Sequence, residues 1–379
     1  MKVLHVTPSF YPATQYGGPI YSGYSLCNHL AEIPGLYLRV LTTDSDGTDR
    51  IEVPRAHAIR NGSYPVHYCR RWLGSDFAPG MFLRLVPMIR WADVIHLTAV
   101  YSPPTIPTLL LCKLFRKPVV WSVRGALQRW QGSTRTLPKK IWERLSDALC
   151  DEDRVVLHVT AEEEGRVSRE RITNARIAVI PNGVDIPPSN GEREWRPGKQ
   201  LRLLFLGRLH PIKGIENLLR AIRQLEPATS LSICGSGNKQ YENSLKSLVD
   251  ELSLSDRVRF CGAVSGEEKE KQFCGADICV VPSFSENFGM VVAEALATGV
   301  PVIASKGSPW SEIEKHACGL WVDNDPQSLK EAINRISESS LASMGRNGRE
   351  WMEQEFTWPS IARRMNEVYR GLALKFPRD

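Results

Sequence analysis

The feature that most constrains this fold is the alternation of short apolar runs with longer helical patterns through almost the whole chain. Parallel strands need helical crossovers, so this rhythm predicts parallel sheets with helices on both faces. Strands are predicted over 3–6, 36–41, 93–97, 118–123, 157–160, 177–180, 201–206, 231–234, 258–261, 278–282 and 300–304. Helices are predicted over 21–33, 105–115, 162–171, 215–225, 240–252, 269–274, 289–297 and 358–374.

The rhythm is interrupted once, around residues 181–198. This segment reads PNGVDIPPSNGEREWRPG and contains four prolines and three glycines, a composition typical of a domain boundary. The length of 379 residues also exceeds that of one ordinary domain. We therefore predict two tandem Rossmann-like, doubly wound domains over 1–187 and 188–361. Ligands of such sheets bind at the carboxyl ends of the strands.

All the excess positive charge lies in the first half. Residues 1–187 hold 23 Lys and Arg against 17 Asp and Glu, whereas residues 188–379 hold 25 of each. This imbalance suits a negatively charged partner, unless it is only an uneven solvated surface. No nucleic-acid recognition motif accompanies the charge, so we expect no nucleic-acid partner.

The cysteine spacing and the lengths of the apolar runs indicate in which cellular compartment the protein lies. The nine cysteines show no metal-binding CxxC pair, which favours reduced thiols over disulfides or zinc. The N-terminal apolar run is too short for a signal peptide, and no stretch approaches the ~20 apolar residues of a spanning helix. We expect a cytoplasmic protein, with peripheral binding to the inner face of the cytoplasmic membrane as an addition.

Two basic segments of the first half make an anionic membrane surface a candidate partner, because cations beside exposed aromatic rings suit such a surface. Residues 70–72 lead into 77–90, where apolar residues recur at helical spacing, and packing of this stripe on the sheet is the favoured interpretation. The segment 124–144 carries Trp130 and Trp142 among its basic residues. For this segment, contact with a membrane or an anionic acceptor and simple packing on the protein both stay open.

Two loops that follow predicted strands carry glycines and cations. After 3–6, Gly17 and Gly18 stand just before a helix, where backbone amides can approach an anion, although an ordinary turn also explains them. After 201–206 the sequence reads GRLHPIKG. Arg208 and Lys213 flank its turn and can converge on a phosphate at the strand end.

A third loop carries carboxylates. Glu286 follows the strand 278–282, and Gly289 then opens a helix whose free amides suit a phosphate. Glu294 lies about one turn into this helix, where a carboxylate can accept hydrogen bonds from sugar hydroxyls. The helix is apolar on most faces, so a glutamate inside it needs a partner.

The spacing of Glu286 and Glu294 resembles the EX7E signature of retaining glycosyltransferases of the GT-B fold, and the chain is similar to glycosyltransferase family 4, the glycosyl transferases group 1 family. Further motifs of the resemblance are Gly17-Gly18, PNGVD at 181–185, GR…KG at 207–214 and AxxxGxPVIAS at 295–305. The resemblance covers nearly the whole chain. It implies two Rossmann-like domains that face each other across a cleft, with the last helix, about 362–379, joined to the first domain.

The resemblance implies roles for single residues. Arg208 and Lys213 would neutralise the donor diphosphate. Glu286 would lie near the donor sugar's hydroxyls, Glu294 would hold the nucleotide ribose, and Gly18 would present an amide to the diphosphate. The residues expected to bind the donor are Gly18, Arg208, Lys213, Val264, Phe288, Gly289, Met290, Val291 and Glu294.

Two further positions complete this assignment. Val264 lies in the turn 262–264, which resembles the base-binding segment of the family. Arg124 departs from the pattern, because many relatives carry a histidine there. An arginine can bind a hydroxyl or phosphate but stays protonated and is a poor general base. The residues expected at the reacting centre are Arg124, Arg208, Lys213 and Glu286.

The resemblance implies a metal-independent, retaining glycosyltransferase of the hexosyltransferase type. It would move a sugar from a nucleotide-diphosphate sugar to a glycan or lipid-linked acceptor in bacterial surface-polysaccharide assembly, without a separate cofactor. In the front-face scheme the leaving phosphate oxygen takes the acceptor proton, and the protein positions groups and stabilises charge. Two alternatives stay open: a non-catalytic subunit that binds sugar nucleotides or glycans, and a sugar-nucleotide epimerase.

Weaker signals point elsewhere. Asp-x-Asp occurs at 44–46, 151–153 and 323–325, but only the first follows a strand, and the cations predicted at the diphosphate make a metal redundant. The sequence 235–237 reads GSG and is interpreted as a turn rather than a second phosphate site. His96 ends a strand and would point towards the cleft; a structural role and an acceptor contact both stay open.

Overall fold

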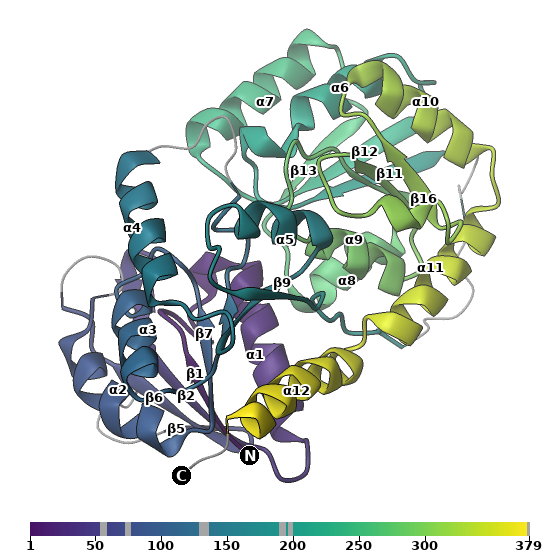
Figure 1. Cartoon of the computed structure of the whole chain (residues 1–379). Coiled ribbons are helices and arrows are strands. Elements are labelled where there is room, and N and C mark those ends of the chain that lie inside the picture. Colours follow the sequence, from purple (N-terminus) through teal and green to yellow (C-terminus); the bar gives the residue numbers. More distant parts are fainter. Residues whose placement is uncertain (54–58, 73–76, 129–135, 189–194, 196–199, 377–379) are drawn as a thin grey trace. The chain divides into compact units, whose positions relative to one another are not determined.

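The computed structural model describes residues 1–53, 59–72, 77–128, 136–188, 195 and 200–376. The chain divides into two compact units (Figure 1). Unit 1 comprises Met1–Gly183 and Trp358–Asp379, and unit 2 comprises Val184–Thr357. The boundaries expected from the sequence, after 187 and after 361, each lie four residues further along the chain.

Unit 1 is built on a sheet that, within the described residues, has eight strands in the order β10-β9-β8-β7-β1-β2-β6-β5. Neighbouring strands are parallel, except that β5 runs antiparallel to β6 at one edge. A small antiparallel ribbon, β3 (Ser45–Asp46) with β4 (Asp49–Arg50), stands apart. The sheet strands are β1 (Lys2–Val6), β2 (Tyr37–Thr43), β5 (Ile59–Asn61), β6 (Tyr64–Cys69), β7 (Val94–Thr98), β8 (Val119–Ser122), β9 (Val155–Val159) and β10 (Arg176–Val179).

Helices bury both faces of this sheet, as the rhythm predicted. Helices α1 (Gly18–Ala31) and α12 (Trp358–Lys375) contact each other and share one apolar cluster with the sheet. Helices α2 (Pro79–Trp91), α3 (Thr105–Leu114) and α4 (Thr136–Leu149) pack with the opposite cluster. Met81, Leu85 and Ile89 of α2 are fully buried there, which confirms that the stripe in 77–90 packs on the sheet. Helix α5 (Glu162–Arg169) connects β9 to β10.

Unit 2 carries a sheet whose described strands are all parallel, in the order β13-β12-β11-β14-β15-β16. Its core lies in two clusters, one on each face. The strands are β11 (Leu201–Leu206), β12 (Thr229–Cys234), β13 (Val258–Gly262), β14 (Ile278–Val281), β15 (Val302–Ser305) and β16 (Gly319–Val322). The helices are α6 (Ile215–Arg223), α7 (Lys239–Glu251) and α10 (Pro326–Ser337) on one face, and α8 (Gly266–Cys274), α9 (Met290–Ala297) and α11 (Leu341–Glu355) on the other.

Two further facts concern the whole described chain. All nine cysteines lie within it and are free thiols. Among the described helices, none combines the length and the apolar character that a membrane crossing requires.

Candidate active site

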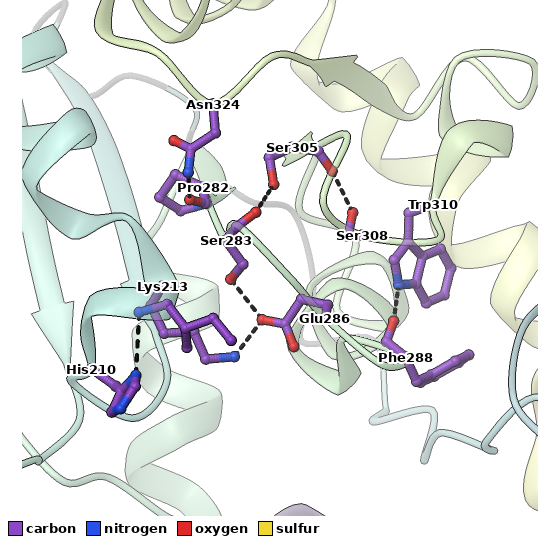
Figure 2. A network of polar contacts seen from close by, with 11 residues as sticks. His210, Lys213, Pro282, Ser283, Glu286, Phe288, Ser305, Ser308, Trp310 and Asn324 are labelled. Carbon is purple, nitrogen blue, oxygen red and sulfur yellow. Dashed lines mark hydrogen bonds and ion pairs between the residues drawn. The ribbon is translucent and has the colours of Figure 1, made fainter. Parts of the chain in front are cut away.

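Loops at the carboxyl ends of β11 and β14 bring Lys213 to Glu286 in unit 2 (Figure 2). Lys213 ends the short 3-10 helix η3 (Pro211–Lys213), and Glu286 lies between β14 and α9. Lys213 Nζ donates a hydrogen bond to Glu286 Oε1, and Ser283 Oγ donates to the same oxygen at 2.7 Å. The two charged side chains are only 20% and 13% exposed. The lysine and the first glutamate of two separate motifs therefore form one partly buried ion pair.

Close backbone packing fixes the position of Lys213. Phe284 N donates to Ile212 O at 2.8 Å, which joins the two loops. Gly214 follows Lys213 with a φ of +63°, a conformation that favours glycine. A Cβ at this position would lie 2.1 Å from Pro282 O. Any other residue at 214 would therefore force the lysine loop away from the end of β14.

Side chains from neighbouring strand ends hold the carbonyls of the glutamate loop. Three of the four contacts reach backbone oxygens within 282–288, so the loop is fixed along its length (Figure 2). The contacts are Asn324 Nδ2 to Pro282 O, Ser305 Oγ to Ser283 O, Trp310 Nε1 to Phe288 O, and Ser308 Oγ to Ser305 O at 2.7 Å.

Helix α9 begins directly after this loop. Gly289 is its N-cap, and the N–H groups of Met290 and Val291 open the helix without a helical acceptor behind them. The positive end of the α9 dipole therefore directly follows the loop that carries Glu286, the partner of Lys213. These amides can bind an anion, and the phosphate contact expected from the sequence stays a prediction.

The second glutamate has a partner that the sequence did not reveal. Glu294 Oε1 accepts a hydrogen bond from Lys269 Nζ of α8 at 2.6 Å. Burial raises the pKa of Glu294, while Lys269 acts in the opposite direction. The partner that a glutamate in this apolar helix needs is therefore a lysine from the neighbouring helix.

Arg208 lies in the same loop as Lys213 but behaves differently. Its side chain is exposed and forms no hydrogen bond or ion pair within the described residues, so it is available to a ligand. His210 lies between these two cations in the sequence. Its pKa is lowered, first by burial and then by the charges of Arg208 and Lys213. His210 Nδ1 accepts from Ile212 N at 3.2 Å. The loop thus concentrates positive charge around a neutral imidazole.

The 235–237 segment supports the Arg208 loop from the next strand. Gly207 N donates to Cys234 O, and Leu209 N donates to Ser236 O, both at 2.9 Å. A Cβ on Gly235 would lie 1.8 Å from the carbonyl oxygen of Gly207. These glycines let two backbones run in contact, which agrees with the interpretation of this segment as a turn.

Val264 lies in the turn between β13 and α8. It is half-buried and packs, together with Met290 and Val291, against the apolar cluster on the α9 face. Gly262 O of the same turn accepts from Gly235 N at 2.6 Å. The turn therefore neighbours the Arg208 loop through the 235–237 segment.

In unit 1, Gly18 is the exposed first residue of α1, and Gly17 caps this helix with a φ of +67°. No described atom lies within 4 Å of a Cβ placed at either position. The helix start is therefore open to a ligand. The predicted contact of Gly18 with a diphosphate stays a prediction.

The Arg124 side chain forms hydrogen bonds with other residues of unit 1. It follows β8 with a φ of +51°, which is unusual for a side-chain-bearing residue. Its Nη1 donates to Asn182 Oδ1 at 2.6 Å and to Ser22 Oγ at 3.1 Å. Burial lowers the pKa of Arg124, and the charge of Glu164 opposes this shift. The guanidinium ties α1 to the PNGVD segment, so its predicted place at the reacting centre stays a prediction.

Glu164 is a buried carboxylate that sequence reasoning missed. It is 0% exposed, and its oxygens accept from Gly125 N, from Thr160 N at 2.6 Å and from Thr160 Oγ1 at 2.8 Å. It therefore fixes the Arg124-Gly125 turn. The only signal was its place at a helix start after a strand, and three successive glutamates there favoured a solvated helix face.

His96 is structural, and the expectation that it points towards a cleft is wrong. It is 1% exposed. Its Nδ1 bonds the Tyr369 hydroxyl, and its Nε2 bonds Ser122 Oγ at 2.6 Å. Ser122 Oγ also bonds His158 Nδ1 at 2.6 Å, and the His5 ring lies 4.6 Å from the His96 ring. The three histidines form a buried cluster, and burial lowers the pKa of each, with the charge of Arg124 acting in the same direction.

The Asp-x-Asp pair at 44–46 is engaged within unit 1. Asp44 Oδ1 accepts from Arg71 N, and Asp46 Oδ1 accepts from Gln15 N, both at 2.8 Å. In the part of the chain that the structure describes, no three His, Cys, Asp or Glu side chains are grouped to hold a metal ion.

Two family models match the chain in sequence. The model for Glycosyltransferase Family 4 matches residues 16–186, and that for Glycosyl transferases group 1 matches residues 190–351. Together they span the loops described above, and the chain belongs to this family of glycosyltransferases.

Individual relatives agree with this assignment. An uncharacterised glycosyltransferase of Methanocaldococcus jannaschii is 32% identical over 52% of this chain and 54% of its own length. The GDP-mannose-dependent alpha-(1-6)-phosphatidylinositol monomannoside mannosyltransferase of Mycobacterium tuberculosis is 30% identical over 52% and 56%. The chain spans about half the length of the curated relatives that it matches first.

Solved structures resemble the chain over almost its whole length. Sucrose-phosphate synthase from Thermosynechococcus elongatus has a TM-score of 0.74 at 23% identity and covers 98% of this chain and 99% of its own. The Anabaena protein HepE in complex with UDP-glucose has a TM-score of 0.70 at 20% identity, with 98% and 100% covered. These likenesses show the fold: two Rossmann-like domains of the GT-B type.

Proposed function

We propose that this protein transfers a sugar, with retention of configuration and without a metal, from a nucleotide-diphosphate sugar to a glycan or lipid-linked acceptor in surface-polysaccharide assembly. The observation that carries the proposal is the Lys213–Glu286 ion pair at the amino end of α9. Family membership supports sugar transfer as the reaction class. The cation-rich loop and the free helix amides suit a diphosphate.

Charge stabilisation is the main contribution of the chain in this proposal. The leaving diphosphate takes Lys213, Arg208 and the α9 amides as its partners, and its oxygen accepts the acceptor proton. Lys213 then breaks its ion pair with Glu286. The freed carboxylate oxygen of Glu286 accepts a hydrogen bond from a hydroxyl of the donor sugar. Glu294 holds the ribose. No side chain of the chain is needed as a general base in this scheme.

The nucleotide is left open by the relatives, since HepE was solved with UDP-glucose and the mycobacterial enzyme is named for GDP-mannose. We expect one nucleotide-diphosphate sugar to raise the melting temperature of unit 2 by mass action. A thermal-shift screen of UDP-, GDP- and ADP-sugars, followed by a transfer assay with the donor found, tests the proposal. A flat profile for all donors contradicts it.

The same screen separates the two alternatives. Nucleotide-sugar binding without transfer or release of free nucleotide diphosphate would favour a non-catalytic subunit. An epimerised donor without a transfer product would favour an epimerase. Arg124 was the reason for the first alternative, and it has hydrogen-bond partners within unit 1, Ser22 and Asn182.

On the acceptor side, we propose that α4 rests on the anionic inner face of the cytoplasmic membrane. Leu137, Ile141 and Leu145 recur every four residues on α4 and are 68%, 53% and 52% exposed. Lys140 and Arg144 between them are also exposed. This combination of aliphatic and basic side chains suits anionic lipid.

The structure corrects which side chains form this surface. Trp142 is turned inward, since its Nε1 donates to Val100 O at 2.7 Å. Arg124 is likewise held by unit 1 itself. Trp130, with Arg129 and Arg135, lies outside the described residues. Within the described part of this segment, exposed aliphatic residues accompany the cations.

The double variant Ile141→Glu/Leu145→Glu should bind phosphatidylglycerol vesicles at least about tenfold more weakly than the wild type, because it removes apolar burial and adds repulsion. Vesicle co-sedimentation at low salt measures this. Leu374→Glu is the matched control, because Leu374 is 82% exposed on α12 of the same unit. Equal binding of the double variant and the wild type, or no wild-type binding, would overturn the membrane proposal.

A further inference from the structure

A polar hollow of about 610 Å³ lies against the unit 2 sheet, at the amino-terminal halves of β11, β12 and β13. Its wall is completed by the last turn of α8 and the residues that follow it. Lys213 and Glu286 follow the carboxyl ends of strands in the same sheet. The hollow is therefore distinct from the loops proposed to hold the donor.

The hollow exists because the residues facing α8 change character along the strands. Towards the carboxyl ends, Leu204 and Cys234 are buried in the apolar cluster that includes Phe273 of α8. Towards the amino ends, the side chains on the same face are polar. They are Arg202, Ser230, Ser232 and Arg259, with Arg202 paired in register with Ser230 and Ser232 with Arg259.

A sheet face under a helix is ordinarily apolar, because a polar group buried there needs a partner. Two basic groups of the hollow have protein partners. Arg202 Nη2 pairs with Asp277 Oδ1 at 2.8 Å, and Arg257 donates to backbone oxygens, among them Thr229 O at 2.9 Å. Their charges are therefore held in fixed positions at the wall.

Two other basic groups lack such partners. Arg259 of β13 and Lys271 of α8 are exposed, and their side chains form no hydrogen bond or ion pair among the described residues. The Ser232 hydroxyl forms no hydrogen bond there either. Asp256 is the one acidic residue of the lining. Two free cations and a free hydroxyl thus face the same space, with one carboxylate against four basic side chains.

We propose that this hollow binds a small phosphorylated molecule, with its phosphate held by Arg259, Lys271 and the Ser232 hydroxyl. Charge-assisted hydrogen bonds of this kind are the strong ones in proteins. The volume lies within the range of small-molecule sites. The polar lining favours a phosphate or sugar-phosphate over an apolar ligand.

Helix α8 connects the hollow to the nucleotide site. Lys271 lines the hollow, and Lys269, two residues earlier on the same helix, holds Glu294 at 2.6 Å. A ligand that draws Lys271 inward shifts the helix that positions Lys269. Occupancy of the hollow should therefore change nucleotide affinity, and this coupling is reciprocal. Only this effect rests on the proposed function; the binding site itself does not.

The experiment is calorimetric titration with inorganic phosphate and with glucose 6-phosphate at low salt. The double variant Arg259→Gln/Lys271→Gln should weaken binding by about tenfold or more, because two charge-assisted hydrogen bonds are lost. Arg335→Gln is the matched control, because Arg335 is an exposed arginine on α10 of the same unit. The same titrations are repeated in a Lys213→Gln background, so that phosphate bound at the donor loop does not contribute.

Loss of binding in the double variant, with wild-type affinity in Arg335→Gln, supports the site. Unchanged affinity in the double variant, or no wild-type binding up to about 20 mM, overturns it. Nucleotide titrations with and without phosphate then test the coupling. Failure of every nucleotide to bind the wild type would contradict the proposed function and leave the phosphate result standing by itself.

Discussion

Replacing Lys213 with alanine should lower sugar transfer by about a thousandfold, the loss typical of a group that stabilises transition-state charge. Glu286→Gln should act in two directions. It releases Lys213 from the ion pair seen in the structure, so nucleotide diphosphate should bind more tightly, by about tenfold. Transfer should nevertheless fall by about a hundredfold, since the charged acceptor for the sugar hydroxyl is lost.

Nucleotide-diphosphate affinity and single-turnover transfer rates, measured in parallel, check this pair of variants. Lys315→Ala is the matched control, because Lys315 forms an exposed ion pair with Glu312 at 2.9 Å in the same unit. It should leave both quantities unchanged. Wild-type affinity and rate in Lys213→Ala, or weaker nucleotide binding by Glu286→Gln, would contradict the assigned roles.

Acid should destabilise unit 1 from about pH 6.5 downwards, because three histidines are buried in it. Burial, followed by the charge of Arg124, lowers the pKa of His5 and of His158 to about 3. Burial also lowers the pKa of His96 well below its ordinary value. Below about pH 6.5 these histidines bind protons in the unfolded chain but stay neutral in the folded unit.

Stability is therefore constant above about pH 6.5 as far as these groups are concerned, and falls as the pH drops towards 3. His5 and His158 each contribute about 1.4 kcal/mol per pH unit in this window, so the two together remove about 5 kcal/mol between pH 6.5 and 4.5, and His96 acts in the same direction. A loss of this size is comparable to the whole stability of a domain.

The measurement is the free energy of unfolding of unit 1 across this pH range. His158→Asn should reduce the slope by about one proton. Tyr369→Phe is the control, since it removes the hydroxyl bonded to His96 but keeps all three imidazoles, and should lower stability without changing the slope. If the free energy of unfolding of the wild type does not change with pH down to pH 4.5, the three histidines are not buried in their neutral form.

The sequence predicted the parallel sheets well because their strands are short apolar runs between clear helices. It missed elements whose pattern is weak. β6 reads YPVHYC, with a proline and a histidine inside it. α11 carries Gly345 and Gly348, poor helix formers, yet a Cβ at 345 would lie 2.3 Å from Gly299 O. Tertiary packing requires those glycines, and no local pattern reveals this.

The candidate site was predicted in part for a similar reason. Glu286 and Lys213 stand at strand ends, and parallel topology brings strand ends to one edge. Lys269 and Glu164 were missed because their partners are set by how helices pack onto the sheet. The orientation of Arg124 depends on Ser22 and Asn182, which lie 102 and 58 residues away in the chain. Spacing within a motif carries no information about such contacts.

Helix α12 has a consequence for how the chain is made. It supplies Met365 and Tyr369 to the core that α1 shares with the first sheet. The two stretches of unit 1 are separated by the 174 residues of unit 2. On the ribosome, the part of the first sheet and of α1 that α12 covers must therefore stay exposed until all of unit 2 has emerged. The later-made unit can fold first, and chaperone binding to the nascent chain should centre on α1.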